Sequence, residues 1–196
     1  MNICLIVEGH GDVFAAPALI RRVASELGYY GELEIPRPFR LSRGQMVKKD
    51  ELMRTVELMS RKAGGNGAVI ILFDADDDCP VELAAAVGEW LAERPDVHAH
   101  VIVANREFEC WYIASAEALR GVRGLSVAAA CPADPDLIRD GKGWLGRQMS
   151  NGYSETLDQS AFAASIDVGL SVRSRSFRKF VKILSQILGV GTPATA

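Results

Sequence analysis

Acidic side chains follow two apolar segments of the chain at a spacing that suits metal-dependent chemistry. Glu8 comes directly after the apolar run 3–7. Asp74 comes directly after the run 68–73, and Asp76 stands two residues later. Both runs are short, apolar and partly β-branched, which indicates buried strands. Since parallel strands end at the same edge of a sheet, we expect these carboxylates to converge there. Carboxylate oxygens alone form a hard donor set, which suits Mg²⁺ or Mn²⁺.

The acidic loop 74–78 also has a structural interpretation that needs no metal. It holds four carboxylates within five residues, and these repel one another unless positive charge lies nearby. A helix that begins near Pro80 would supply such charge at its N-terminus, and Asp78 is well placed to cap it. A capping loop is therefore the alternative, and we favour the metal site because ligands bind at strand ends.

Glu8 lies in a glycine-rich segment, with Gly9 next to it and Gly11 two residues further on. Glycine lets the backbone turn tightly and lets a phosphate or a metal ion approach closely. A carboxylate at the end of a buried strand is unfavourable unless a metal or a nearby lysine or arginine compensates its charge. His10 stands between the glycines, and we expect it to be exposed because histidine suits softer metals than Mg²⁺.

Two more carboxylates, Glu107 and Glu109, follow the apolar run 98–104. This run reads as a further strand, so both carboxylates reach the same edge of the predicted sheet. Residues two apart on a helix point in different directions. We therefore expect one of the two to face the site and the other to be solvated.

Cations gather near the C-terminus at helical spacing. The segment 174–188 places apolar residues such as Phe177 and Val181 on one face and a basic stripe on the other. A basic stripe can follow nucleic-acid phosphates, but an amphipathic helix with a solvated outer face is the simpler alternative, which we favour. Arg43 and Lys142 belong to two smaller basic clusters. The candidate nucleic-acid contacts are Arg175, Arg178, Lys179 and Lys182.

Hydrophobic periodicity predicts an α/β fold up to about residue 119. Apolar runs predict strands at 3–7, 32–39, 68–73 and 98–104. The second is at best an edge strand, because it contains two prolines. Apolar residues at helical spacing predict helices at 12–27, 45–61, 80–93 and 108–119. Strands and helices alternate, which indicates a mostly parallel four-stranded sheet flanked by helices.

The pattern changes after residue 121, where only helical periodicity is found. It predicts helices at 135–149, 154–166 and 174–188. We interpret 120–188 as a helical extension packed on the α/β core 1–119. The small and polar segment 189–196 is predicted to be a disordered tail.

Composition limits the class of protein. The chain has 196 residues, 48% of them hydrophobic, and a net charge of −3, which argues against a polybasic nucleic-acid binder but leaves room for a local basic face. It has no signal-like start and no apolar stretch near the ~20 residues that span a bilayer, so we expect no membrane association. Its four cysteines form no CxxC pair, which favours free thiols in a reducing cytoplasm over a zinc site or disulfides.

Several motifs together resemble a known domain. Glu8 after a first strand, Asp74 and Asp76 after a third and an acid after a fourth resemble the Toprim domain of topoisomerases, primases and the overcoming-lysogenisation-defect nucleases. A closer match comes from the segments 7–12 (Val-Glu-Gly-His-Gly-Asp), 73–78 (Phe-Asp-Ala-Asp-Asp-Asp) and 106–111 (Arg-Glu-Phe-Glu-Cys-Trp). With the later segments 156–159 (Thr-Leu-Asp-Gln) and 174–177 (Ser-Arg-Ser-Phe), the chain is similar over nearly its whole length to a bacterial Toprim-like family of unknown function, DUF4276.

The resemblance implies roles for individual residues. Glu8 would be the Toprim glutamate, Asp74 and Asp76 the metal-binding pair, and Glu109 the later acid of the set. In nuclease-type Toprim proteins such residues hold a divalent metal for phosphodiester cleavage. The chain would then be a metal-dependent phosphoryl-transfer enzyme, with a nuclease as the favoured type, although DNA, RNA and a small phosphate ester all stay open as the substrate. Some Toprim-like proteins stand beside ATPases in anti-phage systems, so the resemblance also implies an ATPase as a partner.

Two other functions remain open from the sequence. In the first, the chain is a non-catalytic Toprim-like interaction module of an ATPase-containing complex, and the acidic cluster is vestigial or structural. In the second, it is a haloacid-dehalogenase-type phosphatase with Asp74 as nucleophile and Asp76 as acid. The phosphatase is disfavoured because its motif follows a first strand, not a third, and has threonine or valine two residues after the second aspartate.

Overall fold

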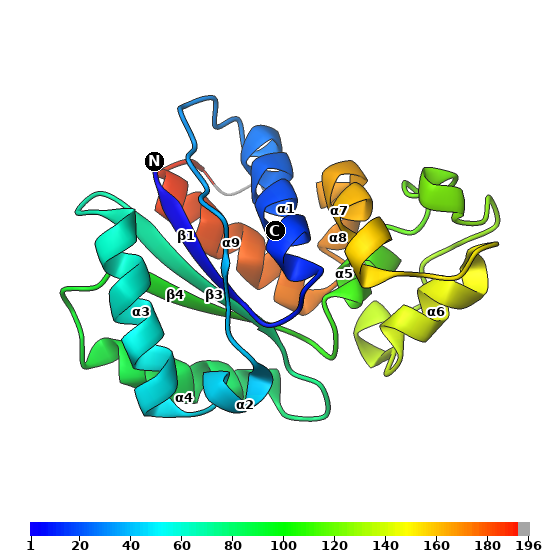
Figure 1. The fold of residues 1–196 in the computed structure, drawn as a ribbon. Coiled ribbons are helices and arrows are strands. Elements are labelled where there is room, and N and C mark those ends of the chain that lie inside the picture. The colour runs from blue at the N-terminus through cyan, green and yellow to red at the C-terminus, as the bar shows by residue number, and fades with distance from the viewer. Residues whose placement is uncertain (192–196) are drawn as a thin grey trace.

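The sheet has four strands, all of them parallel, in the order β2-β1-β3-β4 (Figure 1). The computed structural model describes residues 1–191, so most of the predicted tail 189–196 lies outside the described residues. The strands are β1 (Ile3–Val7), β2 (Phe39–Arg40), β3 (Ala68–Asp74) and β4 (Ala99–Ala104). The α/β fold class and the parallel sheet are thus confirmed.

Helices cover both faces of the sheet, and the side-chain alternation of the strands explains why. Along β1, Cys4 and Ile6 pack in the core shared with α3 (Lys49–Ala63) and α4 (Pro80–Ala92). Ile3, Leu5 and Val7 belong to the core on the other face. There the sheet is covered by α1 (Asp12–Glu26) and α9 (Arg175–Leu188) (Figure 1). Strands buried on both faces are expected to be continuous apolar runs, as β1 and β3 are.

Two of the predicted N-terminal elements differ from the structure. The predicted edge strand 32–39 is reduced to β2 and one isolated bridge between Asn2 and Glu34. Two prolines within the segment lack the backbone N–H that a strand ladder needs. The predicted helix 45–61 is divided into α2 (Arg43–Met46), which opens with a capping box at Ser42, and α3.

Two of the helices predicted after β4 are also shorter than expected, whereas the predictions 154–166 and 174–188 are confirmed. The predicted helix 108–119 is a six-residue, fully buried α5 (Glu109–Ala114). The predicted helix 135–149 is a 3₁₀ turn, η2 (Pro135–Leu137), followed by α6 (Gly141–Gln148). The Asp140 side chain caps α6 by accepting from the Gly143 N–H at 2.8 Å, so the new helix begins there.

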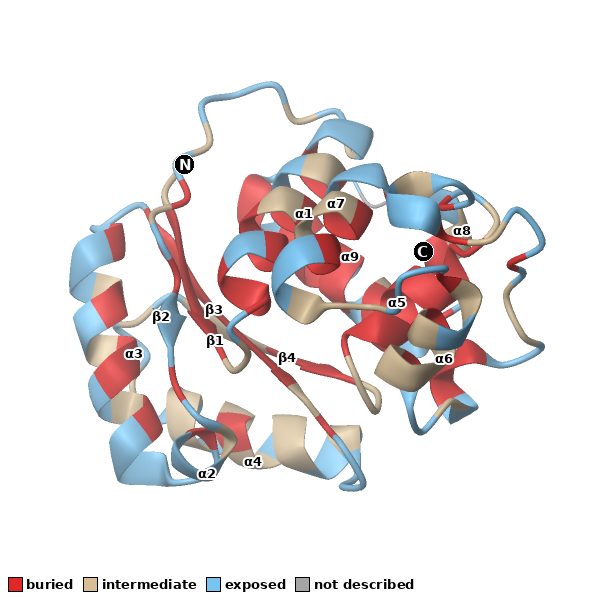
Figure 2. Ribbon diagram, turned by 45° about the vertical axis from the view of Figure 1, so that its right-hand side comes forward, coloured by how far each residue is buried: buried red, intermediate tan, exposed pale blue. Residues whose placement is uncertain are grey.

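The remaining segments pack against other helices of the fold. They are the 3₁₀ turn η1 (Val122–Gly124), α7 (Glu155–Ser165), which lies along α1, and α8 (Val168–Ser171). Buried side chains continue from the sheet through α5 into α7 and α9 (Figure 2), and Phe108, Phe162 and Phe177 belong to one core. Within residues 1–191 no helix has the length and apolarity to cross a bilayer.

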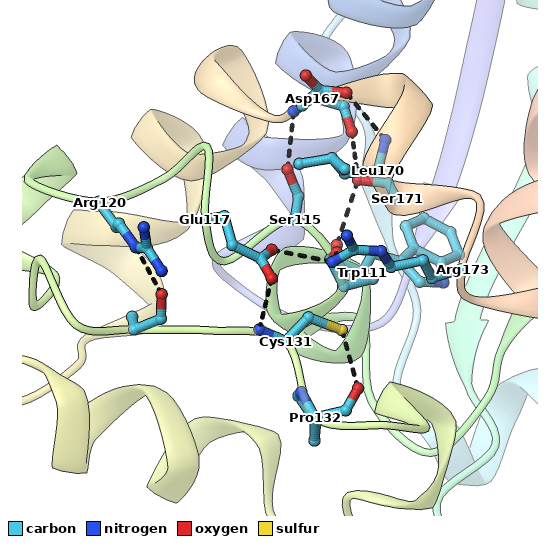
Figure 3. A network of polar contacts seen from close by, with 12 residues as sticks. Trp111, Ser115, Glu117, Arg120, Cys131, Pro132, Asp167, Leu170, Ser171 and Arg173 are labelled. Carbon is cyan, nitrogen blue, oxygen red and sulfur yellow. Dashed lines mark hydrogen bonds and ion pairs between the residues drawn. The ribbon is translucent and has the colours of Figure 1, made fainter.

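A polar network ties α5 to the later segments (Figure 3). Glu117 accepts hydrogen bonds from the Cys131 N–H at 3.1 Å and from Arg173 Nη1 at 2.9 Å. Ser115 Oγ accepts from the Asp167 N–H at 2.9 Å, and Ser171 Oγ donates to the Asp167 carbonyl at 2.8 Å. Residues far apart in sequence thereby hold α5 in place.

The amphipathic helix α9 packs as predicted, with Phe177, Phe180, Val181 and Leu184 fully buried. Trp111 stacks on Phe180 with ring centroids 5.4 Å apart and lies edge-on to Phe177 at 5.4 Å. Aromatic pairs of this kind stabilise a core beyond the area that they bury. The apolar face of α9 therefore packs in the core, whatever the function of its charged face.

We expect Phe177→Ala to lower the free energy of unfolding by about 3–5 kcal/mol, because it leaves a cavity among aromatic side chains. Chemical denaturation followed by tryptophan fluorescence measures this loss. Lys182→Ala, on the exposed face of the same helix, should change stability by no more than about 0.5 kcal/mol. A similar loss in both variants would contradict the assigned packing of α9.

Candidate functional site

Carboxylates meet at the edge of the sheet where the parallel strands end. Glu8 follows β1, Asp74 is the last residue of β3, and Glu109 begins α5, five residues after the end of β4. Asp12, in the first turn of α1, joins them. The charge of each of the other three carboxylates raises the pKa of Asp74, which shows that the structure brings them together.

Asp74 occupies the middle of this carboxylate cluster, which we define as Glu8, Asp12, Asp74 and Glu109. Its Oδ1 accepts a hydrogen bond from the Phe108 N–H at 2.8 Å. Burial raises the pKa of Asp74 well above its usual value, and the nearby charge of Glu109 raises it further. The Asp74 carboxylate therefore favours a proton or another positive charge beside it.

Glu109 is completely buried although it is ionisable. Its Oε1 accepts from the Tyr153 hydroxyl at 3.0 Å, while its Oε2 has no hydrogen-bond partner. Burial raises the pKa of Glu109 to about 8, against the opposing positive charge of Lys142. A buried carboxylate oxygen without a partner is rare in native structures and calls for a ligand, a proton or a water molecule.

Glu8 presents a second such oxygen, since its Oε2 is also buried without a partner. Burial raises the pKa of Glu8, the charge of Asp76 raises it further, and the guanidinium of Arg43 opposes both effects. The expected convergence of Glu8 and the aspartate pair on one edge of the sheet is thus seen in the structure.

Asp74 and Asp76 differ in position. The Asp76 side chain is 59% exposed and stands at the rim of the cluster, 3.9 Å from Arg43 Nε. Asp76 and Arg106 both adopt positive φ angles, of 52° and 63°. Two hydrogen bonds join them, from the Asp76 N–H to the Arg106 carbonyl at 2.9 Å and from Arg106 Nη1 to the Asp76 carbonyl at 3.1 Å. Such strained backbone persists only where its surroundings enforce it, and it is common at functional sites.

The rest of the acidic loop is paired with arginines. Asp77 binds Arg106 Nη1 at 2.8 Å, and Asp78 binds Arg43 Nη2 at 2.7 Å. The prediction that Asp78 caps the helix after the loop is wrong, because the N-cap of α4 is Cys79 and Asp78 is held by Arg43. The loop is thus rimmed by positive charge from two separate segments.

Asp12 is a cluster residue that the sequence analysis did not single out. Its Oδ2 accepts from the Gly9 N–H at 2.7 Å, and its Oδ1 accepts from Gln159 Nε2 at 3.0 Å. A Cβ atom on Gly11 would lie 2.1 Å from Gln159 Oε1, so Gly11 makes room for α7. Asp12 and Gln159 both belong to the motifs that carried the family resemblance, which was the available signal.

Lys142, at the start of α6, is the cation of the cluster. Its Nζ lies 2.7 Å from Glu155 Oε1. Burial alone would lower its pKa, but the carboxylates of Glu109, Glu155 and Asp74 raise it above the usual value. Lys142 therefore stays protonated and neutralises part of the negative charge around it.

We expected one of Glu107 and Glu109 to face the site and the other to be solvated. Glu109 does face the site, but the Glu107 carboxylate is held by backbone N–H groups. Its Oε2 accepts from the N–H groups of Gly141 and Lys142 at 2.7 and 3.2 Å. A Cβ atom on Gly141 would lie 2.9 Å from that oxygen, so glycine permits the approach. Glu107 thus fixes the N-terminus of α6, and through it Lys142, beside the cluster.

The donor types of the cluster fit a hard cation, but their spacing does not form a finished metal site. Within residues 1–191 no three or more His, Cys, Asp or Glu side chains are grouped so that they could hold a metal ion. Within the cluster, Glu8 Oε2 and Glu109 Oε2 are buried and have no hydrogen-bond partner, so both oxygens are available as ligands for an ion. His10 is exposed, as expected.

The basic residues of α9 lie apart from the cluster, on the outer side of that helix. Arg175, Lys179 and Lys182 are exposed. Arg178 is half-buried and donates from Nη1 to the Val172 carbonyl. The four cysteines are free, as expected.

We expect the metal-free protein to lose stability as the pH rises from 6 to 9. The folded state keeps the Glu109 carboxyl protonated up to about pH 8, whereas the unfolded chain releases that proton near 4.5. The folded state therefore binds more protons in this window, and its stability falls as they are released. Differential scanning fluorimetry in EDTA should show a decrease of roughly 5 °C or more in melting temperature.

Glu109→Gln should remove much of this dependence, since a glutamine can still accept from Tyr153 and carries no charge. Glu51→Gln, on the exposed face of α3, is the matched control and should behave as the wild type. An unchanged pH dependence in Glu109→Gln would show that Glu109 is ionised in the folded protein.

Comparison with known proteins adds one finding to this geometry. No curated protein matches the chain, and no solved structure matches it. The family described as "Domain of unknown function (DUF4276)" matches residues 7–185, which include every residue of the carboxylate cluster. The chain therefore belongs to the DUF4276 family.

Proposed function

We propose that this protein is a divalent-metal-dependent phosphoryl-transfer enzyme, a nuclease of the Toprim type that uses Mg²⁺ or Mn²⁺. One observation carries the proposal: carboxylates from the ends of three parallel strands meet at one edge, and two of their buried oxygens have no partner. Unpaired buried charge is unfavourable unless it serves a ligand or a reaction.

Glu8, Asp74, Asp76 and Glu109 are the residues proposed to hold the ion. A bound divalent ion would neutralise the charge of a scissile phosphate and lower the pKa of a water molecule. The oxygen-only set excludes the thiolate and imidazole ligands that zinc prefers. Glu8, half-buried at the rim, is the proposed base for an attacking water, and burial keeps its pKa raised towards a useful range.

Cations of this chain would position the phosphate. Arg43 and Arg106 bind the acidic loop from two separate segments and already neutralise its outer carboxylates. Lys142 faces Glu109 and Asp74 from α6. Guanidinium and ammonium groups next to an acidic metal site balance the charge of a bound phosphodiester.

The proposed partner rests on the family resemblance, whereas the proposed substrate follows from the nuclease activity and the proposed compartment from the cysteines. A nucleic acid is the proposed substrate, an ATPase in an anti-phage system the proposed partner, and the cytoplasm the compartment that suits four free cysteines. The phosphatase alternative gains no support, because Asp74 accepts a hydrogen bond from Phe108 and lies among carboxylates that weaken it as a nucleophile.

A specific observation favours a second candidate, a non-catalytic interaction module. Lys142 already compensates the cluster, and no finished group of three metal ligands is present within residues 1–191. In this alternative the carboxylates and Lys142 form a structural charge network. Metal binding and cleavage must therefore be measured separately.

Cleavage is tested with single- and double-stranded DNA and RNA in Mg²⁺ and in Mn²⁺. We expect cleavage by the wild type and a loss of roughly 100-fold or more in Asp74→Asn, which keeps the acceptor for Phe108 but loses the charge. The matched control is Asp96→Asn, which changes an exposed aspartate at the opposite edge of the sheet. Equal activity in all three proteins would indicate a contaminating nuclease.

Metal binding is tested by melting temperature at pH 8.5. An ion at about 100 times its dissociation constant stabilises the folded state by roughly 2.7 kcal/mol. Asp74→Asn should be more stable than the wild type in EDTA, because repulsion is relieved, and should gain less from Mg²⁺. Stabilisation of the wild type without cleavage of any substrate would support the interaction module, and no stabilisation would exclude the metal site.

A further inference from the structure

The outer edge of β4 is an open strand edge. In a parallel strand, alternate residues direct their N–H and C=O groups to opposite sides. The carbonyls of His98 and Ala104 accept from β3, from the N–H groups of Val69 and Ala75 at 2.9 Å each. The groups of the intervening odd-numbered residues, Val101 among them, therefore point away from the sheet.

The open ladder has a defined end. The Asn105 N–H, which also points outwards, donates to Ser176 Oγ at 3.0 Å. The Ala99 N–H donates to the Val97 carbonyl at 3.0 Å. The Ala99 carbonyl and the outward N–H and C=O groups of Val101 and Val103 thus remain for another strand, which matches a peptide of about five or six residues. Edge strands without such a partner are commonly protected by charge or by a covering segment.

A groove of about 520 Å³ runs along this same edge, with Val101, Val103 and Asn105 among its lining residues. One wall comes from α4, where Val81, Ala84 and Ala85 are lining residues and Val81 is 74% exposed. The coincidence of the open backbone groups with the groove is what distinguishes this edge from an ordinary surface depression.

The opposite wall is basic. Arg175 and Lys179 of α9 line it, and neither forms a side-chain ion pair within the described residues. A strand laid along β4 would alternate its side chains between the two walls. Apolar side chains would meet α4, and side chains of opposite charge would meet Arg175 and Lys179.

We propose that this groove binds an extended peptide of a partner protein, with alternating apolar and acidic residues, as a fifth strand on β4. This is a function in addition to the proposed catalysis and does not depend on it. Backbone hydrogen bonds to the outward groups supply affinity in such strand addition, and the two walls supply specificity. Arg175 and Lys179 thereby serve a carboxylate-bearing peptide and not a nucleic acid.

The chemistry argues against the other occupants. A second copy of the chain would present its own β4, Ala-His-Val-Ile-Val-Ala, which has no carboxylate for Arg175 and Lys179. It would also bring a second pair of these cations close to the first, and like charges across an interface are unfavourable. A nucleic acid would satisfy the cations but leave the backbone groups of the edge strand unpaired.

The probe is an acetylated and amidated hexapeptide of alternating valine and glutamate, labelled for fluorescence anisotropy. We expect saturable binding and slower hydrogen exchange at the Val101 and Val103 amides. Lys179→Glu should weaken binding at least tenfold, whereas Lys182→Glu, exposed on the same helix but outside the groove, should leave it unchanged. The same peptide with all its backbone amides N-methylated should not bind in either strand orientation, and this control needs no change in the protein.

Val101→Pro adds a test on the protein side, since proline is tolerated at an outward-facing edge position but blocks a further strand. Failure of the hexapeptide to bind at millimolar concentration, or equal binding of a valine–lysine peptide, would overturn the proposal. So would a dimer in sedimentation velocity that Val101→Pro converts to monomers, since a second copy would then fill the groove. Loss of oligonucleotide binding in Lys179→Glu with unchanged peptide affinity would assign the cations to nucleic acid instead.

Discussion

Repulsion among desolvated carboxylates is the constraint on which one end of this molecule depends. Parallel strands must end at the same edge, so Glu8, Asp74 and Glu109 cannot avoid one another once the sheet forms. The buried helix α5 excludes water from them, which raises the unfavourable energy of their negative charge. A proton, the Lys142 ammonium or a bound cation can relieve this repulsion. The raised pKa values of Asp74 and Glu109 favour protonation, and the carboxylates keep the nearby Lys142 charged.

The helical extension is part of the site and not an addition to it. Lys142 from α6, Tyr153 before α7 and Gln159 from α7 all reach the carboxylates or their partners. Without these segments water would reach the carboxylates, and burial would no longer raise their pKa values. Two of the glycines at which an added Cβ would clash, Gly11 and Gly141, lie where the extension meets the core. The extension therefore sets the electrostatic character of the sheet edge.

Periodicity and strand polarity were enough to predict the sheet, its flanking helices and the convergence of the acidic residues. The length of the second strand was wrong because prolines before β2 lack the N–H groups that a strand ladder needs. The helix predicted at 135–149 was wrong because the Asp140 side chain caps a new helix there. The contacts of Asp12 with Gln159, 147 residues apart, have no local signature at all. Side-chain direction also escaped prediction, since only the fold shows that Asp76 is exposed while Glu109 is buried.

The two candidate surfaces share one corner of the fold. Ser176 Oγ accepts from the Asn105 N–H, which ends the open ladder of β4, and from Trp111 Nε1 on α5, two residues after Glu109. A peptide on β4 could influence the carboxylates through this corner only if α5 had two stable arrangements. α5 is buried at every residue and Trp111 is packed between Phe177 and Phe180, which favours a single arrangement. We therefore expect partner docking to position the protein without altering the chemistry at the carboxylate edge.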